Sequence, residues 1–216
     1  MARYPVPMVV DLSRFTSTER RIVERLSTPN AVQVWLRSVP YNWEATVRTF
    51  RGVVRERCAN CLEAVLAAAT ILEAHGHPPL VLDLESQDGL DHVLYLFRER
   101  GRWGSIGKSR DVGLHGRRPV FRRVRDLVYS YVDPYVDGSG RIVGFAVFDL
   151  DTLTRADWRL GETEVPSVER ALIAGRHAPL RTSDRRYERA LARYRAFRAL
   201  HPDRPVDDYP DRHRWM

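Results

Sequence analysis

The sequence predicts an α+β fold in which helices from the start of the chain pack on an antiparallel sheet formed by its middle. Apolar residues follow a helical period as far as about residue 75, and the period becomes that of strands from residue 80. Short turns join these strands, which is typical of a meander rather than of alternating strands and helices. The 216 residues, 44% of them hydrophobic and 29% charged, suit a single domain over residues 1–216.

The first predicted elements are helices. One spans about residues 17 to 26, and a second opens at Thr28-Pro29, a capping residue followed by proline, and stops before Pro40. Residues 44 to 55 fit a helix and a strand equally well. From about residue 60 the segment CLEAVLAAATILEA predicts a buried helix, which ends at Gly76 before two prolines.

The later elements are predicted from strand periodicity and from one amphipathic tail. The predicted strands are residues 80 to 86, 92 to 100, 102 to 109 and 140 to 153. Helices are predicted over residues 119 to 131 and, capped by Thr182 or Ser183, over residues 182 to 200, with a tail at 201 to 216.

Charge and cysteine usage limit the classes of function. The formal charge is +7, and all but one of the 35 basic residues are arginines, spread along the chain beside acidic residues. Because no nucleic-acid-binding motif accompanies them, we do not expect nucleic acid as the main partner. No segment has the length of a membrane span or the pattern of a leader, so we expect no membrane partner. Two cysteines three residues apart suit a reducing compartment, which predicts a cytoplasmic protein. The sequence says nothing of oligomeric state.

The pair Cys58 and Cys61 allows three interpretations. A zinc site would need two more ligands, but His75 and His77 lie at the far end of the same predicted helix, roughly 20 Å away at 1.5 Å per residue. A redox couple would fit C-x-x-C at a helix start, yet the charged VVRER before it is a poor buried strand. A single nucleophile, activated by the helix N-terminus and a distant histidine, is the third interpretation.

The order of motifs after Cys61 favours the nucleophile. Cys61-Leu62-Glu63-Ala64 begins the helix, Gly76-His77-Pro78 forms a turn, His92 opens the next strand but one, and Gly101-Arg102-Trp103 lies in a hairpin. In this order and spacing, residues 58–111 resemble the core of the transglutaminase-like superfamily, which has a papain-like Cys-His-Asp site. The resemblance implies that Cys61 is the nucleophile and His92 the general base and acid, with Cys58 a bystander.

The third member of the site departs from the family's pattern. The resemblance implies an acidic residue about four positions after Trp103, where this chain has Gly107. If Arg100-Gly101 is a two-residue turn, His92 lies opposite Ser109, and Asp111 is the diagonal neighbour on the same face. We therefore expect Asp111 to orient the imidazole, with Ser109 as the alternative.

The resemblance implies thiol-dependent acyl transfer to, or hydrolysis of, an amide in a peptide or protein, with no metal or organic cofactor. Protease, amidase and crosslinking reactions share this chemistry, and the sequence does not separate them. The competing hypothesis is a noncatalytic binding module that keeps the fold and uses its arginine-rich surface for an acidic protein or nucleic acid.

Overall fold

The structure is a computed structural model that describes residues 11–204, 206, 209 and 212–215. In this part of the chain, six strands form one antiparallel sheet in the order β4-β3-β2-β1-β5-β6. The strands are β1 (Leu80–Ser86), β2 (His92–Glu99), β3 (Arg102–Ile106), β4 (Arg117–Phe121), β5 (Ile142–Asp149) and β6 (Ala178–Pro179). The predicted α+β class is confirmed.

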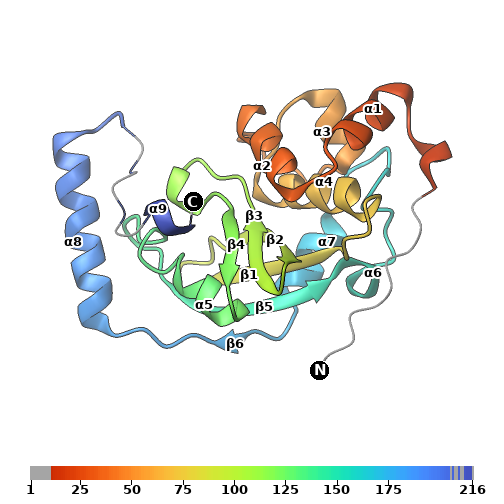
Figure 1. Ribbon diagram of the computed structural model, residues 1–216. Coiled ribbons are helices and arrows are strands. Elements are labelled where there is room, and N and C mark those ends of the chain that lie inside the picture. The colour runs from red at the N-terminus through yellow and green to blue at the C-terminus, as the bar shows by residue number, and fades with distance from the viewer. Residues whose placement is uncertain (1–10, 205, 207–208, 210–211, 216) are drawn as a thin grey trace.

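Helices lie on both sides of this sheet (Figure 1). Over the described residues they are α1 (Ser17–Arg25), α2 (Pro29–Ser38), α3 (Phe50–Glu56), α4 (Cys61–Glu73), α5 (Val124–Tyr129), α6 (Leu150–Leu153), α7 (Pro166–Ile173), α8 (Asp184–Leu200) and α9 (Arg212–Trp215). Two short 3-10 helices are η1 (Leu12–Arg14) and η2 (Val112–Leu114). Figure 1 shows α1 to α4 gathered over one face of the sheet, while α8 lies at the opposite end of the molecule.

Helix α4 is the centre of the larger core. A capping box fixes its start: the Asn60 side chain accepts a hydrogen bond from the Glu63 N–H, and the Glu63 carboxylate accepts one from the Asn60 N–H. Every residue of the helix after the first is buried. The helix shares one hydrophobic cluster with Val81, Val93 and Tyr95, which alternate along β1 and β2 toward this face.

The opposite face of the sheet has its own core. It is formed by the other set of alternating side chains, Leu80, Leu82, Leu84, Leu94 and Leu96. Helix α5 and the segment after it cover these leucines with Leu127, Val128, Tyr131, Val132 and Tyr135. Because α4 lies on one face and this segment on the other, β1 and β2 are buried on both sides, which explains their nearly continuous apolar sequences.

Most predicted elements are confirmed, including the helices near residues 17 to 26 and 28 to 39, the buried helix from residue 60, and strand 80 to 86. The structure decides the ambiguous stretch 44 to 55 in favour of a loop followed by α3. The C-terminal helix is confirmed as α8, with Ser183 as its N-cap. The tail 201–216 falls in part outside the described residues.

Three predictions about element boundaries are wrong. Residues 119 to 131 do not form one helix: they begin in β4 and become helical only at α5. Pro119 fits β4 because this strand is at the edge of the sheet, where a missing N–H costs no ladder bond. Strand 102 to 109 ends at Ile106, and the predicted strand 140 to 153 ends at Asp149, where α6 follows.

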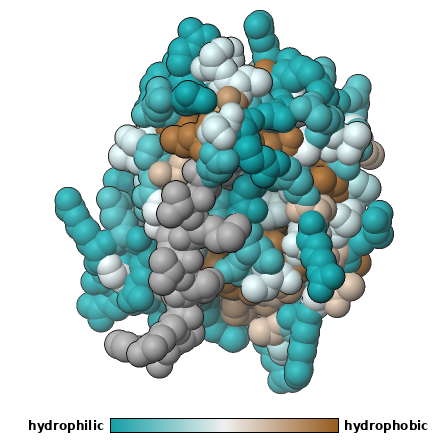
Figure 2. All heavy atoms as spheres, turned by 90° about the vertical axis from the view of Figure 1, so that its right-hand side faces the viewer, coloured by the Kyte–Doolittle hydropathy of each residue, from teal (hydrophilic) through white to brown (hydrophobic). Residues whose placement is uncertain are grey.

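No helix among the described residues is long and apolar enough to cross a membrane. On the face shown in Figure 2, hydrophilic side chains cover most of the surface outside the grey atoms.

Candidate active site

A pocket of about 460 Å³ opens where the N-terminus of α4 meets the start of β2. Its walls come from the segments 41–47, 60–62, 88–92, 109–114 and 135–140, together with one residue of α7. All four residues predicted for the site, Cys61, His92, Ser109 and Asp111, line this pocket. The sheet therefore brings together residues that lie up to 50 positions apart in the sequence.

Cys61 is the first residue of α4 and is half-buried at the wall of the pocket. Burial raises the pKa of its thiol, while hydrogen bonds from the backbone N–H groups of Val93 and Leu62 oppose that rise. The Val93 contact puts the Cys61 sulfur beside the first residues of β2. Because burial is the larger effect, Cys61 is a neutral thiol at pH 7 in the free protein.

His92 is the first residue of β2 and is only 5% exposed. Its Nε2 lies 2.9 Å from the backbone carbonyl oxygen of Leu114. A carbonyl only accepts hydrogen bonds, so this contact assigns the ring proton to Nε2 and leaves the lone pair on Nδ1. Burial lowers the pKa of His92 to about 4. The imidazole is therefore neutral at pH 7.

The hairpin expected to place the third residue is confirmed only at its tip. Glu99 pairs with Arg102, as predicted, and the turn residues Arg100 and Gly101 have φ angles of 46° and 76°. Strand β3 then ends at Ile106, three residues before the position opposite His92.

The expected role of Asp111 is not seen in the hydrogen bonds of His92. Nε2 of His92 bonds to the Leu114 carbonyl, and the Asp111 carboxylate takes no part in that contact. Asp111 lies just before η2, and burial raises the pKa of its carboxyl. The Ser109 hydroxyl accepts a hydrogen bond from the Asp111 N–H. Both side chains line the pocket, and the orienting role expected of Asp111, or of Ser109, stays a prediction.

Two buried side chains explain why β3 ends early. One is Gln33 of α2, and the other is Lys108, which follows the end of β3. The Gln33 side chain donates to the Gly107 carbonyl and accepts from the Gly107 and Gly116 N–H groups, so it replaces a strand partner there. Lys108, which is buried, donates through Nζ to the carbonyls of Leu36 and Val39. These contacts pull residues 107 and 108 toward the end of α2.

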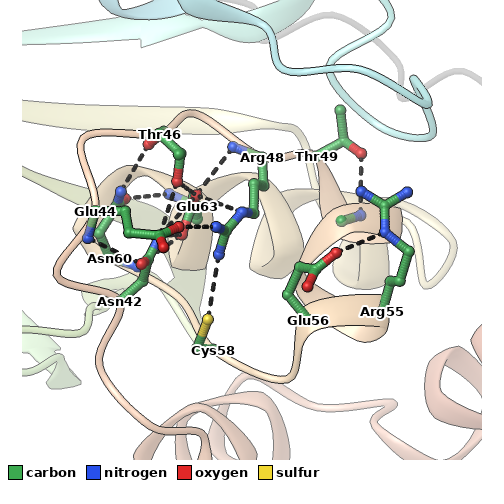
Figure 3. A network of polar contacts seen from close by, with 11 residues as sticks. Asn42, Glu44, Thr46, Arg48, Thr49, Arg55, Glu56, Cys58, Asn60 and Glu63 are labelled. Atoms are coloured by element: carbon green, nitrogen blue, oxygen red, sulfur yellow. Dashed lines mark hydrogen bonds and ion pairs between the residues drawn. The ribbon is translucent and has the colours of Figure 1, made fainter.

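The wall formed by residues 41–47 is fastened by the carboxylate of Glu63, which is completely buried (Figure 3). Its oxygens accept hydrogen bonds from the Asn42 side chain at 3.0 and 3.2 Å, the Thr46 hydroxyl at 2.7 Å and the Arg48 N–H at 3.1 Å. The capping contact with Asn60 completes the shell. Glu63 thus ties the loop to the same helical turn that begins with Cys61.

The wall formed by residues 109–116 is fastened by Arg117, which is 2% exposed. Its guanidinium donates to the carbonyls of Gly113 and His115, both at 2.6 Å, and so contacts the residues on either side of Leu114. The rings of Tyr131 and Trp215 lie over the guanidinium at 3.8 and 3.9 Å. Arg117 therefore holds the backbone segment that presents the Leu114 carbonyl to His92.

Cys58 is in a different environment from Cys61. Both cysteines are free thiols, and the Cys58 sulfur accepts a hydrogen bond from Arg48 Nη1 at 3.2 Å (Figure 3). The two sulfurs therefore contact different parts of the chain, Arg48 for one and the start of β2 for the other.

Sequence reasoning missed the residues that support the site. A backbone carbonyl such as that of Leu114 leaves no signal in a sequence, and neither does the contact between Gln33 and Gly107. The pattern Asn60-x-x-Glu63, by contrast, is a readable capping box. Among the described residues, no three His, Cys, Asp or Glu side chains are grouped to hold a metal ion.

Comparison with known proteins adds no relative to this picture. No protein-family model matches the chain, and no curated protein matches it either.

Proposed function

We propose that the protein catalyses thiol-dependent acyl transfer or hydrolysis of an amide or ester, with Cys61 as nucleophile and His92 as general base and acid. The observation that carries the proposal is the shared pocket: a thiol at a helix N-terminus and a buried imidazole with a defined tautomer line the same cavity. The resemblance of residues 58–111 to the transglutaminase-like superfamily supports the same chemistry.

The neutral state of both groups determines the order of steps. When a carbonyl substrate enters, Cys61 Sγ attacks its carbon while the S–H proton passes to Nδ1 of His92. The backbone N–H groups at the start of α4 are suited to hold the resulting oxyanion. The imidazolium then gives its proton to the leaving amine or alcohol as the bond to carbon breaks. Water, deprotonated by His92, releases the acid and restores the thiol.

The test is acylation by an activated ester, followed by intact mass and peptide mapping. The parent protein and Cys58→Ala should gain one acyl group on the peptide that contains Cys61, and Cys61→Ala should gain none. His92→Gln should slow acylation by about 10²- to 10⁴-fold, as expected when a general base is lost. Equal rates in the parent and in His92→Gln, or a label on Cys58, would exclude this mechanism.

The same experiment decides between the proposal and its competitors. A reversible disulfide between Cys58 and Cys61, together with full loss of reactivity in Cys58→Ala, would indicate a redox couple. A Cys61 that stays unreactive toward every acyl donor would indicate the noncatalytic binding module.

A further inference from the structure

The charge of the pocket is opposite to that of the chain. The protein has a formal charge of +7, yet six of the residues that line the pocket are acidic: Glu44, Asp88, Asp91, Asp111, Asp137 and Glu169. Among the lining residues that the structure describes, Arg110 is the only arginine or lysine. A cleft lined by one sign of charge concentrates ligands of the other sign.

Two of these carboxylates, Asp88 and Asp91, accept hydrogen bonds from neutral donors. Glu44 forms an ion pair with Arg48. Asp88 instead accepts from neutral donors, the hydroxyls of Ser86 at 2.5 Å and Ser139 at 2.9 Å. Asp91 likewise accepts from the backbone N–H of Ser86. Neutral donors fix the positions of these oxygens without cancelling their charge.

Like charges also oppose one another across the pocket. Asp111 and Asp137 come from different segments and both line the cavity. Burial raises the pKa of the Asp111 carboxyl; the charge of Arg110 opposes that rise, and the carboxylate of Asp137 adds to it. A bound cation would relieve this repulsion.

The pocket already contains one guanidinium on an aromatic ring. Trp43 is 75% exposed at the pocket wall, and the guanidinium of Arg110 lies over its ring at 5.8 Å. Tyr41 packs against Trp43 edge-on, with ring centroids 5.2 Å apart. The exposed ring of Trp43, beside carboxylates, provides the two kinds of contact that hold a planar cation.

We infer that the acyl donor is cationic, and that the pocket selects an arginine-like guanidinium near the carbonyl that Cys61 attacks. This inference rests on the proposed function, because it assigns the ligand of the same pocket. The contacts of the pocket favour a guanidinium over an ammonium, since both its face and its edge find partners.

The test uses a matched pair of ligands, Nα-acetyl-arginine and Nα-acetyl-citrulline, which differ in charge but hardly in shape. Binding of their amides is measured on Cys61→Ala, and acylation by their ethyl esters on the parent protein. We expect the arginine compound to be preferred by about tenfold or more at low salt. The preference should fall when salt rises from about 0.02 to about 0.5 M.

Two double variants test which carboxylates cause the preference for the arginine compound. Asp137→Asn with Glu169→Gln removes two carboxylates from the pocket lining, while Glu24→Gln with Glu188→Gln removes two exposed ones outside it. The first should reduce the arginine preference to within about threefold, and the second should leave it as in the parent.

The outcomes separate the two proposals. Equal binding and equal acylation by both compounds would overturn the cationic substrate while the proposed function stands. A binding preference for arginine without acylation of Cys61 would end the proposed function but support a pocket for cations. If the arginine preference is unchanged in Asp137→Asn with Glu169→Gln, these two carboxylates do not select the cation.

Discussion

The two walls of the pocket are fastened by buried groups of opposite charge. Glu63 holds residues 41–48 with hydrogen bonds from side chains and backbone groups that all lie within residues 42–63. Arg117 holds residues 113–115 through backbone carbonyls, but one of the two rings over it, Trp215, comes from the last helix of the chain. The wall beside Cys61 is thus held by residues close to it in the sequence, whereas the wall beside His92 depends on contacts from the C-terminal end of the chain.

This difference indicates which changes in the chain should disturb each half of the site. A buried carboxylate surrounded by short-range donors stabilises its loop through residues that are close in the sequence. A buried guanidinium needs elements far along the chain to exclude water from it. Changes to the C-terminal segment should therefore affect His92 and leave the loop beside Cys61 unchanged.

The largest effect is expected from Glu63→Ala. It leaves the Thr46 hydroxyl and the Arg48 N–H without their buried acceptor, so we expect a loss of about 4 kcal/mol in the free energy of unfolding. Urea unfolding measures this loss, and Glu24→Ala, an exposed acid on α1, is the control. A loss as small as that of the control would show that the Glu63 network does not fasten this wall.

A slightly smaller loss in the free energy of unfolding is expected when the pH is lowered. The pKa of His92 falls to about 4 in the folded protein from 6.5. The unfolded chain therefore takes up a proton first, and stability should fall between pH 6.5 and about 4, by about 3 kcal/mol for this group. Asp83 acts in the opposite sense: burial raises its pKa from 3.8 to about 6, so its protonation favours the folded state as pH falls through that range.

Two variants separate these contributions in urea unfolding at pH 7 and near pH 4.5. His92→Gln should lose less stability on acidification than the parent, and Asp83→Asn should lose more. An unchanged pH dependence in His92→Gln would mean that the imidazole is not held neutral by burial.

An intermediate effect is expected from Arg117→Met. It removes the contacts to Gly113 and His115 but also the cost of burying a charge, so the net loss should be about 2 kcal/mol. The ring nitrogens of His92, followed by ¹⁵N NMR, should change from a single Nε2–H tautomer to a mixture. Arg122→Met, at an exposed position, is the control. A single tautomer in Arg117→Met would contradict the role of Arg117 in placing the Leu114 carbonyl.

The smallest effect is expected from Trp215→Ala. Loss of one ring over Arg117 should cost about 1 kcal/mol and loosen the His92 tautomer less than Arg117→Met does. Trp43→Ala removes an exposed ring from the other wall and should leave stability nearly unchanged. If both variants behave alike, the C-terminal helix does not support the site.

Much of the fold follows from sequence patterns, because helix caps and period changes are local. Ser183, the turn at Arg100-Gly101 and the apolar run of β1 need no distant partner to be recognised. The edge strand β4 was missed because it is short and its last residues fit the amphipathic helix that was predicted from residue 119. Only the sheet order shows that an edge position accepts that proline.

The site was predictable to a smaller degree. The order Cys61, His92 and Asp111 along the chain identified three residues that line one pocket. The partner of His92 was not predictable, since a backbone carbonyl can come from any residue and the path of residues 107–116 is set by contacts with Gln33. The acidic character of the pocket was hidden because its carboxylates come from separate segments of a basic chain.

The central claim is that His92 deprotonates a neutral Cys61, and its most direct test is the rate of Cys61 acylation by an activated ester at pH 7 and pH 5.5. With the pKa of His92 near 4 and that of Cys61 raised, the base is free at both pH values, so the account predicts nearly equal rates. Reaction through the small equilibrium fraction of thiolate, without a base, would instead lose about 30-fold in rate over this interval, since that fraction falls tenfold per pH unit below the thiol pKa. That loss in the parent protein would contradict the account, whereas His92→Gln, which lacks the base, is expected to show it.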